Sequence, residues 1–177
     1  MTDITQYAHA LFSLATESGR EDKIGEELSL LSSLIKENPK YTSLLDTPAL
    51  SLGERASLID EAFSSLDEYV RNTFKLLAEA RLTYTLSKLS DIYGELLDEK
   101  RGVLRAEAIS AIPMTESQTA ALKEKLEKET GKTVIIKNTV DTSILGGVIL
   151  RYAGLSEDGS LKNRLEKIKK TLFETKL

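Results

Sequence analysis

The hydrophobic pattern near the start of the chain predicts a helix whose apolar face is unusually wide. Projected at about 100° per residue, the apolar residues between positions 3 and 17 cover roughly 200°, about twice the arc that a surface helix needs. The flank that would face its own domain consists of Ile4, Ala8, Leu11, Phe12 and Ala15. Tyr7, Ala10 and Leu14 remain and need a second cover. Either the helix is buried at the centre of a bundle, or it offers this second flank to a partner.

A second helix, predicted from Asp67 to about Ala80, repeats this pattern. Its apolar residues again spread over roughly 200° at helical spacing, and they are Tyr69, Val70, Phe74, Leu76, Leu77, Ala78 and Ala80. Tyr69 and Leu76 lie far round this helix from Phe74. If the two wide helices lie side by side, their surplus flanks form a groove of the kind that accepts an amphipathic partner helix.

The rest of residues 1–102 is also helical in pattern, which predicts an all-α six-helix bundle. The first helix has Asp3 as a candidate cap and Gly19 as its terminator. The other apolar stripes have ordinary width, and they run from Ile24 to Ile35 before Asn38-Pro39, from Tyr41 to Leu45, from Leu58 to Leu66 after Ser51, and from Leu82 to about Arg101.

Beyond Gly102 the pattern changes to short runs that are typical of strands. These runs are Val103 to Ala111, Thr133 to Thr139 and Gly147 to Ala153. Between the first two, a capping box at Thr115 to Gln118 and a terminator at Gly131 delimit a helix. A last helix follows Asp158-Gly159-Ser160, with an apolar stripe formed by Leu161, Leu165, Ile168 and Leu172. Residues 103–177 therefore predict a small α/β C-terminal domain.

Charge and composition exclude several functions. Residues 1–102 hold 11 basic and 18 acidic side chains, and residues 103–177 hold 13 and 10. The net charge of -4 argues against a nucleic-acid binder, which is usually basic. The chain has no cysteine, which excludes disulfides, thiolate zinc sites and a cysteine nucleophile. Its single histidine, His9, excludes a histidine-rich metal site and argues against a serine-histidine triad.

Targeting and membrane signals are weak. The first ten residues lack the pattern of a signal or transit peptide. No apolar run approaches the ~18 residues of a membrane span, and the longest, Ile144 to Leu150, includes two glycines. We therefore expect a cytosolic chain without direct membrane insertion, which is compatible with docking on a membrane complex.

Three local motifs bear on possible chemistry. Gly131-Lys132-Thr133 resembles the end of a phosphate-binding loop, but Leu126 occupies the required glycine position and the motif ends a helix instead of starting one. No cofactor is therefore expected. Gly146-Gly147 indicates a positive φ or a close backbone approach, either in a tight turn or beside a ligand. The last helix is basic, which favours either a solvated face or an acidic partner helix.

Five segments together resemble one family. They are Tyr7-Ala8-x-Ala10-Leu11-Phe12, Asn72 to Leu82, Ser110-Ala111-x-Pro113-Met114-Thr115 with Gln118, Val140 to Gly147, and Asp158-Gly159-Ser160-Leu161-x-x-Arg164-Leu165. In this order and spacing they resemble the delta subunit of the bacterial ATP synthase, a relative of the mitochondrial oligomycin-sensitivity-conferring protein. The chain departs from the family pattern at two places. Ala80 stands where the family often has glycine, and the segment before Asp158 is about one residue shorter. The shorter segment leaves it undecided whether the last β-hairpin forms.

The resemblance implies a non-catalytic part of the stator. In this family the N-terminal domain grips the N-terminal helix of an alpha subunit, and the C-terminal domain holds the b subunits of the peripheral stalk. The implied alpha-binding residues are Tyr7, Ala10, Leu11, Leu14, Asn72 and Leu76, and the residues implied in stator assembly are Gly147 and Asp158. The implied location is peripheral, at the cytoplasmic side of the cell membrane, within the synthase.

Two alternatives stay open at this point. A cytosolic two-domain adaptor that binds an unrelated amphipathic helix would share the same wide helices. An enzyme is disfavoured, because the residues assemble no nucleophile-base pair, metal cluster or phosphate loop.

Overall fold

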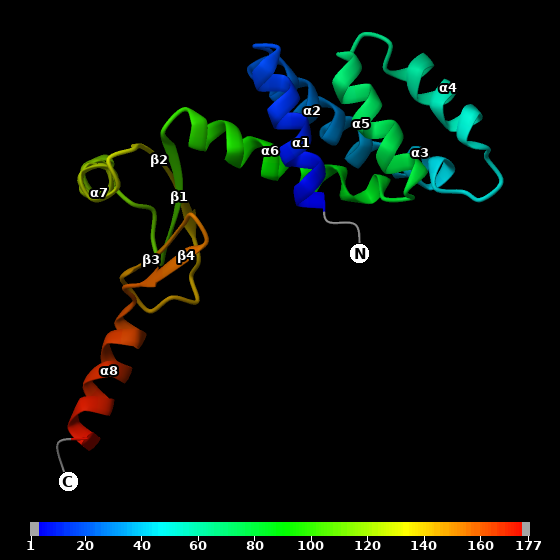
Figure 1. The fold of residues 1–177 in the computed structure, drawn as a ribbon. Coiled ribbons are helices and arrows are strands. Elements are labelled where there is room, and N and C mark those ends of the chain that lie inside the picture. The colour runs from blue at the N-terminus through cyan, green and yellow to red at the C-terminus, as the bar shows by residue number, and fades with distance from the viewer. Residues whose placement is uncertain (1–3, 175–177) are drawn as a thin grey trace. The chain divides into compact units, whose positions relative to one another are not determined.

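The chain folds into two compact units, residues 1–97 and residues 98–177. The computed structural model describes residues 4–174, and in its last helix it describes no side chain at residue 168 or at residues 170–174. The predicted cap Asp3 and the side chains of Ile168 and Leu172 therefore lie outside the described residues. The first unit is helical and the second combines a sheet with helices (Figure 1), which confirms the predicted order of an all-α part and a small α/β part.

The helices of the first unit follow the apolar stripes of the sequence. They are α1 (Ile4–Glu17), α2 (Glu21–Glu37), α3 (Pro39–Leu45), α4 (Leu52–Ala62), α5 (Glu68–Glu79), the short 3-10 helix η1 (Thr83–Thr85) and α6 (Leu86–Lys100). Ser51 and Glu54 form a reciprocal capping box at the start of α4. Gly19 has a φ of 61° just after α1, as expected of a helix terminator. The predicted stripe runs to Leu66, but α4 ends at Ala62. Leu66 is buried, in the segment that follows the helix.

The segment between α5 and α6 differs from the prediction of one helix from Leu82 to Arg101. Arg81 takes a left-handed conformation with a φ of 56°. The Leu82 N–H donates to the Leu77 carbonyl at 2.8 Å and the Arg81 N–H donates to the Ala78 carbonyl at 3.1 Å. This is a Schellman motif, and it ends α5 although no glycine occupies the left-handed position. The short helix η1 then connects this turn to α6.

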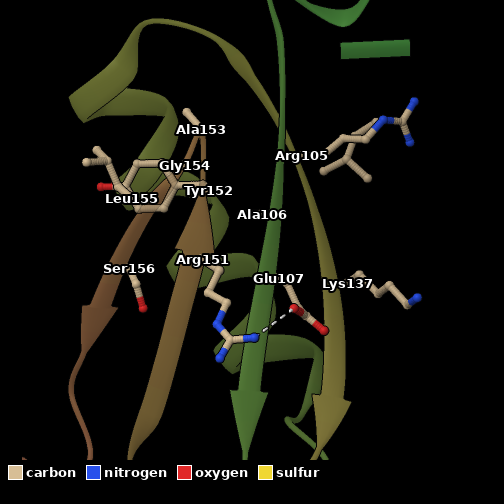
Figure 2. Close-up of a pocket in the computed structure, with 11 residues that line it drawn as sticks. Arg105, Ala106, Glu107, Lys137, Arg151, Tyr152, Ala153, Gly154, Leu155 and Ser156 are labelled. Atoms are coloured by element: carbon tan, nitrogen blue, oxygen red, sulfur yellow. Dashed lines mark ion pairs between the residues drawn. The ribbon is translucent and has the colours of Figure 1, made fainter. Parts of the chain in front are cut away.

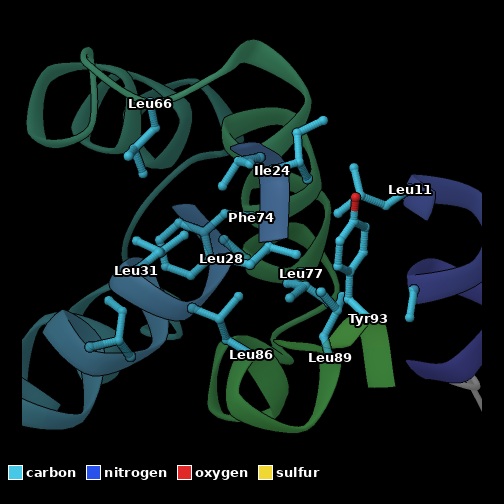
Figure 3. Close-up of a cluster of buried hydrophobic side chains, with 14 of the residues drawn as sticks. Leu11, Ile24, Leu28, Leu31, Leu66, Phe74, Leu77, Leu86, Leu89 and Tyr93 are labelled. Carbon is cyan, nitrogen blue, oxygen red and sulfur yellow. The ribbon is translucent and has the colours of Figure 1, made fainter. Parts of the chain in front are cut away.

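One continuous core holds the first unit together (Figure 3). It includes Leu11 of α1, Leu28 and Leu31 of α2, Phe74 and Leu77 of α5, and Leu86, Leu89 and Tyr93 of α6. The Tyr93 hydroxyl donates a hydrogen bond to the Glu21 carbonyl at 3.0 Å, so the one polar atom of this buried ring is satisfied. α2 contacts α1, α3 and α5, which makes it a central element of this unit.

The second unit is built on a four-stranded sheet in the order β2-β1-β3-β4. Its elements are β1 (Val103–Ser110), α7 (Glu116–Thr130), β2 (Thr133–Val140), β3 (Val148–Tyr152), β4 (Leu155–Asp158) and α8 (Leu161–Glu174). β1 and β2 are parallel and joined through α7, whereas β3 is antiparallel to both β1 and β4. Thr115 and Gln118 form the predicted capping box of α7, and Gly131 ends α7 with a φ of 67°.

The last β-hairpin, whose formation the resemblance did not decide, is present as β3 and β4. Ala153 and Gly154 connect β3 to β4 with φ angles of 47° and 74°. Two successive positive φ angles are typical of the two-residue hairpin turn that matches the twist of the strands. The shorter segment before Asp158 is therefore sufficient to form the fourth strand, which the hydrophobic pattern did not reveal.

Candidate functional site

The inward flank of α1 is buried as the sequence predicts. Ile4, Ala8, Leu11 and Ala15 belong to the core of the first unit. Leu11 is only 2% exposed, so it differs from the other residues proposed to bind a partner. Its side chain lies in the core and does not reach the surface of the first unit.

The second flank of α1 lies at the surface. Leu14 is 47% exposed, Ala10 is exposed and Tyr7 is half-buried. On the other side of this helix, the Phe12 ring packs edge-to-face against Tyr93 of α6, with the ring centroids 5.4 Å apart. Because Tyr7 and Leu14 lie more than about 120° round the helix from Phe12, they face away from α6.

α5 exposes a corresponding flank. Leu76 is 50% exposed, Asn72 is exposed and Tyr69 is half-buried. On the opposite side, Arg71 and Lys75 form ion pairs with Asp60 of α4 at 2.9 and 2.7 Å. Tyr69 and Leu76 therefore face away from α4.

These two flanks meet because α1 and α5 pack against each other. One flank faces away from α6 and the other faces away from α4, on two helices that are in contact. We call this the α1–α5 surface, and it consists of Tyr7, Ala10, Leu14, Tyr69, Asn72 and Leu76. All the predicted alpha-binding residues except the buried Leu11 lie on these two flanks, exposed or half-buried. The centre of this surface is apolar, and no hydrogen-bonded pair of side chains within this set suggests a reaction.

A charged network fixes the start of α5 beside this surface. The carboxyl group of Asp67 is almost fully buried and pairs with Arg20 at 2.8 Å and with Lys23 at 3.5 Å. Burial raises the pKa of Asp67 and is the largest single influence, but the hydrogen bond from the Tyr69 N–H and the charges of Arg20 and Lys23 together lower this pKa below its ordinary value. The Arg20 guanidinium also lies over the Tyr69 ring, 4.6 Å from its centroid.

In the sequence, Asp67 is recognisable only as the start of a helix, and nothing there predicts this network. Arg20 and Asp67 are 47 positions apart, so no local pattern connects them. The sequence offers only two separate signals. Arg20 stands beside the predicted terminator Gly19, and Asp67 stands at the predicted start of α5.

Gly147 and Asp158, the residues implied in stator assembly, lie close together at the start of α8. Gly147 has a φ of 87°, and a Cβ atom there would lie 2.5 Å from the Gly159 carbonyl oxygen. Asp158 accepts a hydrogen bond from the Ser160 N–H at 2.8 Å. Hydrogen bonds from Ser160, with smaller effects of Lys167 and Lys162, lower the pKa of Asp158. Both residues thus hold the start of α8, and the close approach that the glycine pair indicated is present.

An apolar pocket of about 600 Å³ borders Gly147. Its walls come from the segment after β1 and from one side of α7, and they include Ala111, Ile112, Met114, Leu122 and Lys125. Ile112 is strongly exposed at its rim. Such a pocket suits an apolar side chain of a partner, because it offers little polar chemistry.

A second pocket, of about 510 Å³, lies on the sheet (Figure 2). Arg105, Glu107, Ile135, Lys137 and Arg151 are among the residues that line it, and they come from β1, β2 and β3. Two of its cations have acidic partners, since Arg151 approaches Glu107 at 4.0 Å and Arg105 pairs with Asp98. Among the described residues that line this pocket, Glu107 is the one carboxylate, so the lining offers no acid-base pair.

Residues 4–174 show no metal-binding cluster and no membrane-spanning helix. In this range, no three histidine, aspartate or glutamate side chains gather closely enough to hold a metal ion. None of the helices described there combines the length and apolarity that crossing a bilayer requires.

Comparisons with known proteins agree with one another. Residues 4–172 match the family described as "ATP synthase delta (OSCP) subunit". The chain is 40% identical over 169 residues to the ATP synthase subunit delta of Geobacillus sp. (strain WCH70), covering 95% of each chain. It is 36% identical over 172 residues to the protein of the same name from Clostridioides difficile (strain 630), covering 96% of this chain and 94% of that one.

The fold has a counterpart among solved structures. A chain of the Toxoplasma gondii mitochondrial ATP synthase hexamer superposes with a TM-score of 0.71, 18% identity and 98% of each chain covered. At this identity the likeness concerns the fold, whereas the sequence matches concern the family. Together they confirm the resemblance found in the sequence, and the chain belongs to the ATP synthase delta (OSCP) subunit family.

Proposed function

We propose that this chain is a non-catalytic stator subunit of an F-type ATP synthase, which links the catalytic head to the peripheral stalk. Family membership over residues 4–172 supports this function. In this proposal, the first unit acts as a six-helix bundle that binds the N-terminal helix of an alpha subunit. The second unit binds the b subunits of the stalk. As part of the synthase, the chain is a peripheral protein on the cytoplasmic side of the membrane.

The observation that carries this proposal is the surplus apolar area on α1 and α5. Leu14 and Leu76 are both about half exposed although their helices already bury complete inward flanks. Single exposed leucines are common, but exposed apolar residues on two adjacent helices indicate an interaction surface. A helix laid against both flanks would bury them together, as in other complexes where a groove accepts an amphipathic helix.

The proposed role is mechanical. A rotary synthase transmits torque to its catalytic subunits only if those subunits cannot turn with the rotor. The adaptor must therefore bind tightly at both ends, and nanomolar binding corresponds to about 12 kcal/mol. A few well-packed apolar anchors can supply most of this free energy.

Leu76→Asp tests the alpha-binding surface. We expect this change to weaken binding of a synthetic peptide with the sequence of the alpha N-terminus by about 2 to 4 kcal/mol, as for a central interface anchor. Isothermal titration calorimetry with the full chain measures the effect. Leu30→Asp is the matched control, because Leu30 is 52% exposed on α2 and lies outside the α1–α5 surface. Equal affinities of the Leu76→Asp variant and the unmodified chain would contradict this assignment.

A further inference from the structure

The sheet of the second unit ends in two edge strands that differ in length and chemistry. β4, at one edge, has four residues, and the last two, Glu157 and Asp158, are acidic. β2, at the other edge, has eight residues, of which Lys137 is the one charged residue. Threonine, valine and isoleucine fill most of β2, and these residues favour extended backbone. Of the two edges, β2 is therefore the one suited to accept a further strand.

The hydrogen bonds of β2 alternate between the sheet and its outer side. At the start of the strand, the Thr133 N–H donates to the Gly102 carbonyl at 2.9 Å. Just beyond its end, the Asp141 N–H donates to the Ser110 carbonyl at 2.9 Å. In a parallel pair, every second residue bonds to the neighbouring strand. Because the odd-numbered residues of β2 bond to β1, the N–H and C=O groups of its even-numbered residues point away from the sheet.

Most of these outward backbone groups are open. Among the residues that the structure describes, none forms a hydrogen bond with the outward groups of Ile136, Asn138 and Val140. Val134 is different, because its N–H donates to the Glu127 carboxylate of α7 at 3.0 Å. The open part of the edge therefore runs from Ile136 to Val140, and an extended chain laid beside it could bond to each of its outward groups.

Side chains on the other face of β2 hold this edge in place. Val134 is buried in the core of the second unit, and Ile136 packs against that core. The Asn138 side-chain amide donates to the Ser110 hydroxyl at 2.8 Å and accepts a hydrogen bond from the Met114 N–H at 2.9 Å. Because the strand is already ordered, a chain that binds to it does not have to pay for its folding.

Lys137 decides which kind of chain fits this edge. The side chains of Lys137 and Ile135 are exposed on the sheet face opposite α7, and Figure 2 shows Lys137 on β2. Two copies of β2 paired antiparallel over residues 134–140 would be centred on Lys137 and would place the two lysines directly opposite each other. Like charges in this position are destabilising, whereas an acidic side chain opposite Lys137 is stabilising. The edge therefore disfavours a second copy of this chain and favours an acidic partner.

We propose that the edge of β2 binds an extended acidic segment of another protein as a fifth strand of the sheet. The backbone of this segment pairs with Ile136, Asn138 and Val140. One of its acidic side chains lies opposite Lys137, and an apolar side chain two positions away lies beside Ile135. The inference goes beyond the proposed stator function, because it uses neither the α1–α5 surface nor the start of α8.

The test adds a short peptide to the full chain. The probe is a capped peptide of about seven residues that alternates valine and threonine around a central glutamate. Saturating peptide should slow hydrogen exchange of the Ile136, Asn138 and Val140 N–H groups at least about tenfold. Exchange of the Lys137 N–H, which already bonds to β1, should change by less than about twofold. Nuclear magnetic resonance measures exchange at each amide, and this alternation distinguishes an added strand from binding through side chains alone.

Modified peptides test the backbone contacts directly. In an added strand, alternate N–H groups of the peptide face β2 and the others face solvent. N-methylation of one alternate set should therefore abolish binding, and N-methylation of the other set should not. If both methylated peptides bind, or if neither does, the peptide is not bound as a strand and the proposal is wrong.

A charge exchange tests the role of Lys137. Lys137→Glu should weaken binding of the glutamate peptide at least about threefold, and it should strengthen binding of the same peptide with a central lysine. Lys125→Glu is the matched control, because Lys125 is exposed on α7 about 200° round the helix from Glu127. It should change binding by less than about twofold. Calorimetry gives each affinity, and circular dichroism checks that both variants are folded.

Three results would overturn the proposal. The first is unchanged exchange at Ile136, Asn138 and Val140 with about 1 mM peptide. The second is a Lys137→Glu variant that binds both peptides as the unmodified chain does. The third is protection of these amides without peptide that increases with protein concentration, which would identify a second copy of the chain as the occupant. The proposed stator function stands in each case, because Leu76→Asp tests it on a different surface.

Discussion

At the scale of single residues, Gly147 is constrained in two independent ways. Its φ of 87° lies in the left-handed region that L side chains rarely adopt, and its backbone touches Gly159 and Ser160 at the start of α8. Gly154, in the turn between β3 and β4, has a similar φ of 74° but nothing within 4 Å of a built Cβ atom. Substituting alanine at Gly154 therefore tests the cost of the left-handed backbone alone, whereas substituting it at Gly147 adds the cost of a steric clash.

Gly147→Ala should destabilise the second unit more than Gly154→Ala does. The left-handed conformation alone costs an alanine about 1 kcal/mol, which both variants incur. A Cβ atom 2.5 Å from the Gly159 carbonyl oxygen adds a clash with backbone, so that we expect a total of about 3 kcal/mol for Gly147→Ala. Urea unfolding followed by circular dichroism measures both values. Equal destabilisation in the two variants would show that the clash is relieved at no cost.

Residues of the same type on one helix can also differ in role. Leu11 and Leu14 are three positions apart on α1 and both belong to the predicted alpha-binding set, yet Leu11 is in the core and Leu14 is half exposed. Leu11→Ala would therefore change stability by creating a cavity, whereas a change at Leu14 tests binding. A binding experiment on Leu11 alone could not separate these two effects.

At the scale of elements, the position of α5 depends on the network around Asp67. This residue caps α5 by accepting a hydrogen bond from the Tyr69 N–H at 3.1 Å. It also ties the start of α5 to the start of α2 through Arg20 and Lys23. The Asp67 N–H donates to the Glu27 carboxylate of α2 at 2.6 Å. Because Tyr69 belongs to the α1–α5 surface, the same contacts also set the geometry of that surface.

Asp67→Asn should lower the unfolding free energy at pH 7 by about 1 to 3 kcal/mol, because a buried charge-assisted hydrogen bond is lost. The pKa of Asp67 is lowered in the folded state, so its charge stabilises the fold above the pKa of the unfolded chain. This contribution is lost as the pH falls through the folded pKa. The stability difference between the two proteins should therefore be constant above about pH 5 and shrink below about pH 4.

Urea unfolding at several pH values measures this difference. Asp60→Asn serves as the comparison, because Asp60 pairs with Arg71 and Lys75 but is much more exposed than Asp67. Its effect should be smaller, since exposed ion pairs are screened by solvent. A stability difference between Asp67→Asn and the unmodified chain that persists unchanged at pH 3 would contradict the assigned role of the charge.

At the scale of the whole molecule, two compact units carry opposite charge excesses. Residues 1–102 hold more acidic than basic side chains, and residues 103–177 hold more basic ones. The α1–α5 surface lies entirely in the first unit, whereas Gly147 and Asp158, the residues implied in stator assembly, lie in the second. Because each proposed surface is complete within one unit, the two binding functions should be separable.

A fragment of residues 1–101 should bind the alpha N-terminal peptide within about threefold of the full chain. The fragment keeps all of α6, which is necessary because Leu86, Leu89 and Tyr93 belong to the core of the first unit. Calorimetry measures the affinity, and circular dichroism shows whether the fragment is helical. A folded fragment that fails to bind would mean that the second unit contributes to this site.

Much of the fold follows from local signals. The periodicity of apolar residues predicts the helices, and the capping box at Thr115 marks where one of them begins. These features are readable because each depends on residues three or four positions apart. The excess width of the apolar faces of α1 and α5 also follows from this spacing. It predicts the residues of the candidate surface without any knowledge of tertiary contacts.

The amino-acid sequence by itself thus determined the two-part architecture, most helix limits and the family, because helical periodicity and capping are local and the family motifs lie along the chain. Only the tertiary structure decided that Leu11 is buried while Leu14 is exposed, that Arg81 ends α5 in a left-handed conformation, and that Asp67 pairs with Arg20. It also decided that Gly147 touches the start of α8. These features depend on groups that are distant in sequence and meet only when the helices and strands pack, so no local pattern specifies them.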